Sequence, residues 1–383
     1  MNLHLQRIFN VQQSFDNKDY FLGFRKLLDC VIDTQNMPLY REAIELTDWK
    51  ENHPDNTEEL VLKVNILLEK LKNVSPVLSS RNLPVLIANH ITKSYRTNQF
   101  SLQGGFIEIY KGQVFGLVGE NGNGKTTFLR ILAHELTFDG GELQYNFQDK
   151  PKNAFHLRSR LVYIPQRTAK WYGSLLDNLR FVLSNYEVNP DEIEPRVLMM
   201  VARLGLWKYK DLQWHQLSSG YKMRFELART LLRKPEILLL DEPLANLDIM
   251  SQQIILEDLK SMANSLSHPM AIVLSSQQLY EVEKISDEVI FLNKGKQSSL
   301  NANQKLHSQH LILEIDTKIT REKLVECLQK AQLKSISYNG GIYIAEFLEG
   351  ITFSQVLSQI ANDEIPLVYI RDITSSTRRF FVK

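Results

Sequence analysis

A glycine-rich run between an apolar segment and a helix-forming segment holds the first residues that could do chemistry. The run reads Gly119-Glu120-Asn121-Gly122-Asn123-Gly124-Lys125-Thr126-Thr127 and fits the pattern G-x-x-x-x-G-K-[ST]. Its glycines allow successive backbone N–H groups to face one anion, and a helix N-terminus adds partial positive charge. We expect Lys125 to reach the β- and γ-phosphates of a nucleotide and the Thr126 hydroxyl to bind Mg²⁺. A glycine-rich turn that binds nothing is the alternative.

Two acids end a second apolar run. The four aliphatic residues 237–240 precede Asp241 and Glu242, a pattern typical of a strand buried on both faces of a parallel sheet. Such a strand brings its last residues to the carboxyl edge, where open α/β sheets bind ligands. We expect Asp241 to bind Mg²⁺ and Glu242 to act as general base on the attacking water. Alone, the two acids would also fit an ordinary strand end in solvent.

Further motifs lie between and after these two. They are Leu217-Ser218-Ser219-Gly220-Tyr221, just before a helix, and Leu244-Ala245-Asn246-Leu247-Asp248, just after the acids. With them the chain resembles the ATP-binding cassette (ABC) ATPases, whose signature reads L-S-G-G-Q and whose D-loop reads S-A-L-D or similar. The resemblance covers about residues 84–297. It implies an α/β P-loop NTPase fold with a helical subdomain, and ATP and Mg²⁺ as cofactors.

The resemblance also assigns roles one residue at a time. Tyr95 matches the aromatic residue that stacks on adenine, and packing in the core is the alternative. Gln166 matches the Q-loop glutamine, which touches Mg²⁺ and the attacking water on a loop that faces the membrane partner; an ordinary polar strand end is the alternative. The ATP-binding set that the resemblance implies is Tyr95, Gly119, Asn121, Gly122, Asn123, Gly124, Lys125, Thr126, Thr127 and Gln166, with Thr126, Gln166 and Asp241 toward the metal.

In this family each nucleotide site is shared between two subunits. The resemblance places Ser218, Ser219 and Gly220 against the γ-phosphate bound by the opposite subunit, at a helix N-terminus, and gives Asp248 a role in communication across the dimer. Ser219 replaces the first signature glycine and Tyr221 the glutamine, but the Ser218 hydroxyl and the Gly220 backbone remain. We therefore expect the signature to work. One cassette per chain predicts a homodimer or pairing with a homologue.

A sharper departure follows the next strand. The family usually carries a switch histidine after two serines, and here Ser275-Ser276 leads to Gln277. A glutamine amide can donate to a γ-phosphate oxygen but cannot carry a proton near neutral pH. We expect Lys125, Glu242 and Gln277 to form the catalytic set, with turnover reduced but real.

Composition narrows the class of protein. The 383 residues carry a net charge of +1 with 23% charged residues, so no basic excess indicates a nucleic-acid partner. Cys30 and Cys327 match no metal or redox spacing and are expected to be buried small hydrophobes in a reducing compartment. No segment approaches the roughly 18 apolar residues of a membrane helix, and the first residues lack a signal-peptide core. A cytoplasmic chain is therefore expected, and the resemblance to ABC ATPases implies that it is peripheral on a membrane.

Apolar periodicity divides the chain into three predicted parts. Residues 1–80 form a helical module, with helices around 21–31 and 60–71, a possible third over 37–50, and Asp55 with Glu58 as a possible cap of the 60–71 helix. Residues 84–297 form the ABC cassette. Residues 305–383 form a β-α-β-β-α-β, ferredoxin-like module, with a hairpin turn at 339–341. Many exporter-type ABC ATPases carry a small regulatory extension at this position.

These observations favour the ATPase subunit of an ABC transporter, exporter-type, with separate transmembrane permease chains. A soluble ABC switch that regulates a protein partner is the first alternative, because the N-terminal helices leave room for it. A subunit that binds ATP but hydrolyses it weakly is the second, because of Gln277.

Overall fold

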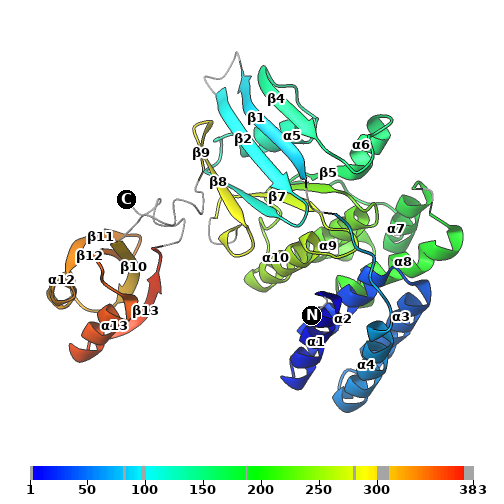
Figure 1. The fold of residues 1–383 in the computed structure, drawn as a ribbon, viewed down its shortest axis with the longest axis horizontal. Coiled ribbons are helices and arrows are strands. Elements are labelled where there is room, and N and C mark those ends of the chain that lie inside the picture. The colour runs from blue at the N-terminus through cyan, green and yellow to red at the C-terminus, as the bar shows by residue number, and fades with distance from the viewer. Residues whose placement is uncertain are drawn as a thin grey trace.

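The structure is a computed structural model that describes residues 3–80, 83–95, 101–186, 188–278, 282–299 and 310–374, without the side chains of 298 and 299. Within these residues a nine-stranded mixed sheet has the order β4-β1-β2-β9-β8-β3-β7-β6-β5 (Figure 1). Its strands are β1 (Pro84–Ser94), β2 (Ser101–Tyr110), β3 (Val114–Val118), β4 (Gly140–Tyr145), β5 (Leu161–Ile164), β6 (Ile237–Leu240), β7 (Ala271–Ser276), β8 (Glu288–Asn293) and β9 (Lys296–Ser299).

The centre of the sheet is parallel. Strands β8, β3, β7, β6 and β5 pair in parallel, and every residue of β3, β6 and β7 is buried. Burial on both faces explains why these strands are continuous apolar runs in the sequence. Because the strands are parallel, the ends of β3, β5, β6 and β7 meet at one edge, and this edge carries the predicted site. The predicted α/β cassette fold is confirmed.

Helices complete the cassette. They are α5 (Lys125–Leu132), α6 (Ala154–Arg160), α7 (Leu175–Ser184), α8 (Pro190–Arg203), α9 (Ser219–Leu231) and α10 (Ile249–Ala263), with 3₁₀ turns η1 (Trp207–Tyr209) and η2 (Trp214–Gln216). Side-chain oxygens of Ser174, Asn189, Ser218 and Asp248 cap the N-termini of α7, α8, α9 and α10. These polar caps before apolar-patterned segments explain why the helices begin where they do. The predicted helix after β7 falls partly on residues 279–281, outside the described residues.

The N-terminal module consists of α1 (Leu3–Asp16), α2 (Tyr20–Thr34), α3 (Met37–Asn52) and α4 (Thr57–Lys72). Helix α1 was not predicted as a separate element. The predicted cap of α4 is wrong by one residue, because Asn56, not Asp55, accepts the hydrogen bond from a backbone N–H, that of Glu59. Both predicted cysteine burials are confirmed, at Cys30 in α2 and at Cys327.

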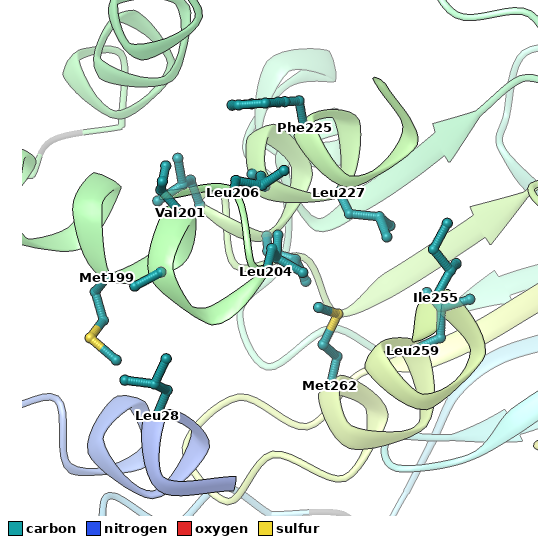
Figure 2. Packing of buried hydrophobic residues seen from close by; sticks show 14 of the residues in the cluster. Leu28, Met199, Val201, Leu204, Leu206, Phe225, Leu227, Ile255, Leu259 and Met262 are labelled. Atoms are coloured by element: carbon teal, nitrogen blue, oxygen red, sulfur yellow. The ribbon is translucent and has the colours of Figure 1, made fainter. Parts of the chain in front are cut away.

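This module packs on the cassette through one continuous apolar core. Figure 2 shows Leu28 of α2 pointing toward Met199 of α8, and the same cluster continues into Leu227 of α9 and Leu259 of α10. Leu28 is fully buried, which contributes about 1.5–3 kcal/mol relative to an exposed side chain. The cluster therefore joins the module to α8, α9 and α10 in one core.

A buried charge network joins the same elements. Asp258 of α10 accepts hydrogen bonds from Arg25 of α2 and from Arg203 of α8, and Arg203 also contacts Asp29 of α2. The side chains of Asp258 and Arg203 are only 1% and 3% exposed. Charges so deeply buried must be paired, because an uncompensated charge there costs several kcal/mol. The network therefore fixes how α2, α8 and α10 lie together.

Residues 310–374 form a separate unit with its own core. Its elements are β10 (His310–Thr317), α12 (Arg321–Lys330), β11 (Leu333–Asn339), β12 (Ile342–Glu349), α13 (Phe353–Asn362) and β13 (Leu367–Asp372). The four strands are antiparallel in the order β11-β12-β10-β13, so the predicted β-α-β-β-α-β arrangement and the hairpin at Gly340 and Gly341 are confirmed. The domain boundaries at 80, 84–297 and 305–383 stay predictions. None of the described helices has the length and apolar character needed to cross a bilayer.

Candidate ATP-binding and hydrolysis site

The phosphate loop connects buried strand β3 to helix α5. Gly122 and Gly124 adopt left-handed φ values of 81° and 100°, which suit glycine, and Gly124 is the residue before the helix. Gly119 lies so close to β8 that a Cβ atom there would come 2.4 Å from the Leu292 carbonyl oxygen. The buried Asn123 side chain accepts a hydrogen bond from the Lys294 backbone N–H at 3.1 Å, which fixes the loop from below. The predicted strand–loop–helix context is present, with the helix beginning at Lys125.

Lys125 is 5% exposed and turns back over its own loop. Its Nζ donates to the carbonyl oxygens of Gly119 at 2.7 Å and Glu120 at 3.2 Å. The Glu242 carboxylate lies 3.3 Å from the same ammonium. The predicted lysine and the predicted base are therefore adjacent, and the positive charge stands at the N-terminus of α5, where an anion is favoured.

Asp241 meets Thr126 at the start of α5. The Thr126 hydroxyl donates to Asp241 at 2.7 Å, and Asp241 is only 4% exposed. Two further groups hold the carboxylate, the Ser275 hydroxyl at 2.7 Å and the Tyr163 hydroxyl at 3.2 Å. Burial, and then the neighbouring Asp241 charge, raise the pKa of Tyr163, so it remains a proton donor. A hydroxyl and a carboxylate side by side fit Mg²⁺, which is commonly held by one or two carboxylates together with nucleotide phosphates.

Glu242 stands at the end of β6 with a left-handed φ of 48°, and its backbone N–H donates to the Ser275 hydroxyl. Its carboxylate accepts hydrogen bonds from the Gln166 amide at 2.9 Å and from the Gln277 amide at 2.9 and 3.1 Å. Both glutamines thus converge on the predicted base. A positive φ in a non-glycine residue costs about 1 kcal/mol or more and is commonly found at functional sites.

Five further residues of the predicted ATP-binding set differ in their surroundings. Gln166 hydrogen-bonds Glu242, and among the described residues no hydrogen bond joins it to Thr126 or Asp241, so its metal role stays a prediction. Tyr95 follows β1, is 38% exposed, and adjoins residues 96–100, which lie outside the described residues. Asn121 and Gly122 are exposed at the tip of the phosphate loop, whereas Thr127 is half-buried in the first turn of α5.

The signature occupies the N-terminus of α9. Ser218 caps the helix by accepting from the Tyr221 N–H, and the Ser219 hydroxyl donates to the Asn246 carbonyl at 3.1 Å. Gly220 is needed for close packing, because a Cβ there would come 2.9 Å from the Ser251 hydroxyl. Ser251 in turn donates twice to Asp248, and its hydroxyl and then its N–H lower the pKa of that carboxyl. The signature and the D-loop therefore form one connected unit.

The signature residues hydrogen-bond to the D-loop and within α9. Among the described residues, no recorded hydrogen bond joins Ser218, Ser219, Gly220 or Asp248 to residues 119–127. Tyr221, the unusual signature residue, instead packs on Tyr209 with ring centroids 3.9 Å apart and a hydroxyl–hydroxyl bond of 2.7 Å.

Sequence reasoning missed Ser275 and Tyr163 as parts of the site. Ser275 binds Asp241 and also accepts from the backbone of Glu242. Strand β7 pairs with β6 so that Leu274 lies opposite Leu240, and the next residue of each strand therefore reaches the same edge. The position of Ser275 directly after the apolar part of its strand could have identified it as a neighbour of Asp241. Tyr163 could not be found in this way, because tyrosine in a strand is common and its hydroxyl position depends on packing.

Comparisons with known proteins support this arrangement. A sequence profile described as ABC transporter matches residues 102–245. The chain is 30% identical over 224 residues to the Nod factor export ATP-binding protein I of Cupriavidus metallidurans, covering 58% of this chain and 70% of that protein. The chain belongs to the ATP-binding proteins of ABC transporters. These are ATPases, so the predicted family and enzyme class are confirmed.

The names of other relatives state import as the direction of transport. The spermidine/putrescine import ATP-binding protein PotA of Mesoplasma florum is 28% identical over 242 residues, covering 63% of this chain and 68% of that protein. The match to PotA of Mycoplasma mycoides spans 63% of that relative, so the chain spans about two thirds of these proteins. The solved structure of cbiO1 from Clostridium perfringens, part of the ABC transporter complex cbiONQ, matches with a TM-score of 0.52 and 26% identity, covering 57% of this chain and 88% of that one.

Proposed function

We propose that this ABC ATPase drives substrate movement through separate membrane-spanning permease chains. The observation that carries the proposal is the convergence of Lys125, Gln166 and Gln277 on the Glu242 carboxylate, beside the Thr126–Asp241 pair. Phosphate binding, a metal pair and a candidate base thus meet at one sheet edge, as phosphoryl transfer to water requires.

Each group has a defined part in the proposed mechanism. Lys125 and the N-terminus of α5 hold the β- and γ-phosphates, and Thr126 and Asp241 hold Mg²⁺, which offsets the phosphate charge when bound. Glu242 takes the proton of the attacking water, and Gln166 and Gln277 orient its carboxylate through their amides. Tyr95 stacks on adenine.

A second subunit completes the site. Ser218, Ser219 and Gly220 stand at a helix N-terminus, the kind of position that binds an anion, and in the described part of the chain no hydrogen bond joins them to the phosphate loop. A two-fold, head-to-tail dimer would bring each signature to the partner's nucleotide, with Asp248 near the dimer interface. ATP would close this dimer, and hydrolysis would release it.

Exposed aromatic side chains that follow Gln166 in the chain offer a place for the permease. Tyr172, six residues along the chain, is 79% exposed, and Phe181 of α7 is 69% exposed. Exposed aromatic residues are enriched where proteins contact partners. We place the chain on the cytoplasmic face of a membrane, gripping permease helices with this surface.

The test is purification of the tagged full-length chain from detergent-solubilised native membranes, followed by mass spectrometry. We expect a stoichiometric multi-spanning protein with the parent chain and with Tyr338→Ala, a control at an aromatic residue that is 59% exposed in the C-terminal unit. Tyr172→Ala should reduce its recovery. Recovery of the chain alone, or with a soluble partner only, would reject the transporter role in favour of an ATP-driven switch.

We propose export as the direction of transport. The C-terminal unit, which the family resemblance associates with exporters, and the relative named for Nod factor export support it. Relatives named for spermidine/putrescine and for sulfate/thiosulfate import make uptake the competing outcome. ATP-dependent accumulation of substrate in inside-out vesicles that hold the identified permease would support export, and accumulation only in right-side-out vesicles would reject it.

A further inference from the structure

A cavity of about 530 Å³ lies where the N-terminal module meets the cassette. Its wall includes residues of α1, α2 and α3 on one side, and of α7, α8, the end of α9 and the end of α10 on the other. The volume is in the range of about 300–1,000 Å³ that is usual for small-molecule sites. It is separate from the phosphate loop, none of whose residues contributes to the wall.

The wall carries an excess of positive charge. Five basic side chains and three carboxylates line it, which leaves two positive charges in excess when His268 is neutral. The three carboxylates are already paired, Asp33 with Arg7, Asp29 with Arg203 and Glu192 with Arg196. The two basic side chains that remain are Arg233 and Lys234, which follow α9 directly and make no ion pair among the described residues.

The hydrogen bonds around Lys234 show that its ammonium has an uncharged acceptor in place of a negatively charged partner. Its ammonium donates to the side-chain oxygen of Gln35 at 2.9 Å, and Arg196 donates to the same neutral oxygen at 3.1 Å. The Gln35 amide group is fixed by the Ile32 carbonyl and the Tyr40 hydroxyl, so its oxygen points at both cations. Two cations therefore share one uncharged acceptor.

Two further nitrogens in the wall are unsatisfied. Arg233 Nε and His268 Nε2 are buried and have no hydrogen-bond partner among the described residues. Lys234 is an exposed residue, but partial burial of its ammonium and then the charge of Arg196 lower the pKa of that group to about 8. Burial and then Lys234 and Arg196 lower the pKa of His268 to about 3. The histidine is therefore neutral, and in both shifts burial is the larger cause and neighbouring positive charge the smaller one.

Apolar side chains form another part of the wall, beside polar ones such as Asn189, Ser261 and Ser265. Leu232, Met200, Met262 and Met270 contribute to it, together with Ile32 of the N-terminal module. Methionine side chains adapt to ligands of irregular shape. We propose that this cavity binds a small organic anion, its charged group facing Lys234, Arg196 and Arg233 and its apolar body lying against the methionines, and that the bound anion regulates ATP turnover.

The regulatory part follows from which helices the cavity touches. Helix α9 begins at the signature and α10 begins directly after Asp248, and residues at or near the far ends of both line the cavity. With 13 and 15 residues, these helices are about 20 and 22 Å long, so the ligand would act through them and not by contact with ATP. A ligand that also holds the N-terminal module would favour one arrangement of these helices. This part rests on the ATPase role proposed above, whereas binding does not.

The binding test uses two fluorescent probes of equal apolar shape. They are 1-anilinonaphthalene-8-sulfonate, which is an anion, and N-phenyl-1-naphthylamine, which is neutral. On the full-length chain without ATP we expect one saturable sulfonate site per chain, with an affinity at least about tenfold higher than that of the neutral probe. Equal affinities for the two probes would overturn the proposal.

Three variants locate the site. Lys234→Met should weaken sulfonate binding at least about tenfold, and Met200→Trp, which fills the cavity, should abolish the saturable site. Lys323→Met removes an exposed charge from α12 in the C-terminal unit and should bind as the parent does. Unchanged affinity in both cavity variants, when circular dichroism shows them folded, would reject the site.

Phosphate-release assays then test regulation. We expect saturating sulfonate to change the ATP hydrolysis rate of the parent at least about twofold but not that of Lys234→Met, whose basal rate should equal the parent's. Sulfonate bound in the cavity without any effect on the rate would overturn the regulatory part. A parent chain that binds the probe but hydrolyses no ATP would reject the proposed ATPase role instead.

Discussion

Replacing Glu242 with glutamine should stop hydrolysis while leaving ATP binding intact. The substitution keeps the size of the side chain and removes its charge and its ability to take a proton. Lys125 keeps two carbonyl acceptors in its own loop, so it is not left unpaired. Gln166 and Gln277 cannot replace the base, because amides do not accept protons near neutral pH. Asp241 is occupied by three hydroxyl donors.

These contacts set the expected magnitude. General bases typically contribute a factor of about 10² to 10⁴, and the lack of a substitute base favours the upper part, a loss of about a thousandfold or about 4 kcal/mol in activation free energy. Phosphate release measures the rate, and light scattering after gel filtration with ATP measures the dimer, which should accumulate in Glu242→Gln. Glu349→Gln, at an exposed position of β12, is the matched control. A Glu242→Gln rate within about tenfold of the parent would refute the reasoning.

Three further predictions follow from other contacts. Gln277→His should raise the ATP hydrolysis rate at least about tenfold, because imidazole can carry a proton where the amide cannot. An unchanged rate of phosphate release would contradict the expectation that Gln277 slows hydrolysis. Gly119→Ala should lower the free energy of unfolding by about 1–3 kcal/mol and weaken ATP binding, because the new methyl group would meet the Leu292 carbonyl. Thermal melting measures the stability and nucleotide titration the binding. Values equal to the parent's would show that β8 moves aside at little cost. Asp258→Ala should destabilise the chain by about 3 kcal/mol, which is the lower end for a broken buried pair because Arg203 keeps Asp29 as a partner. Glu257→Ala, at a 59% exposed partner of Arg25, should cost no more than about 1 kcal/mol. Equal effects of the two substitutions on urea unfolding would mean that the network is not specific.

The sequence predicted which residues meet at the sheet edge, because each of these motifs is local. The phosphate loop and the two acids each occupy a few consecutive residues at a strand end, and parallel strands bring such ends together. The hairpin at residues 339–341 was predictable for the same reason. The choice between Asn56 and Asp55 as cap was not, because both residues have suitable oxygens and Glu58 and Glu59 follow each at the same spacing.

Features that depend on how the N-terminal module packs on the cassette could not be predicted from the sequence. Helix α1 buries His4 and Ser14 and exposes Leu3, Leu5 and Phe9, so its periodicity is blurred. The charges of the network lie far apart in the chain, and charged residues are expected at the surface unless paired. Nothing local identifies which of them pair, since their burial results from the module packing on the cassette.

The charge network also bears on how the N-terminal module could take part in the ATP cycle. Replacing such buried pairs by apolar residues is often neutral or stabilising, so their contribution is better understood as specifying one docking geometry. Asp258 joins α2 to α10 and, through Arg203, to α8, while the backbone N–H groups of Leu266 and Ser267 donate to Asp33 of α2. The module therefore holds two helices from different parts of the cassette. Helix α8 precedes the signature, and α10 directly follows the D-loop. Any rotation between these helices must break buried ion pairs or carry the module with it, and the cavity that they enclose would change shape in the first case and keep it in the second.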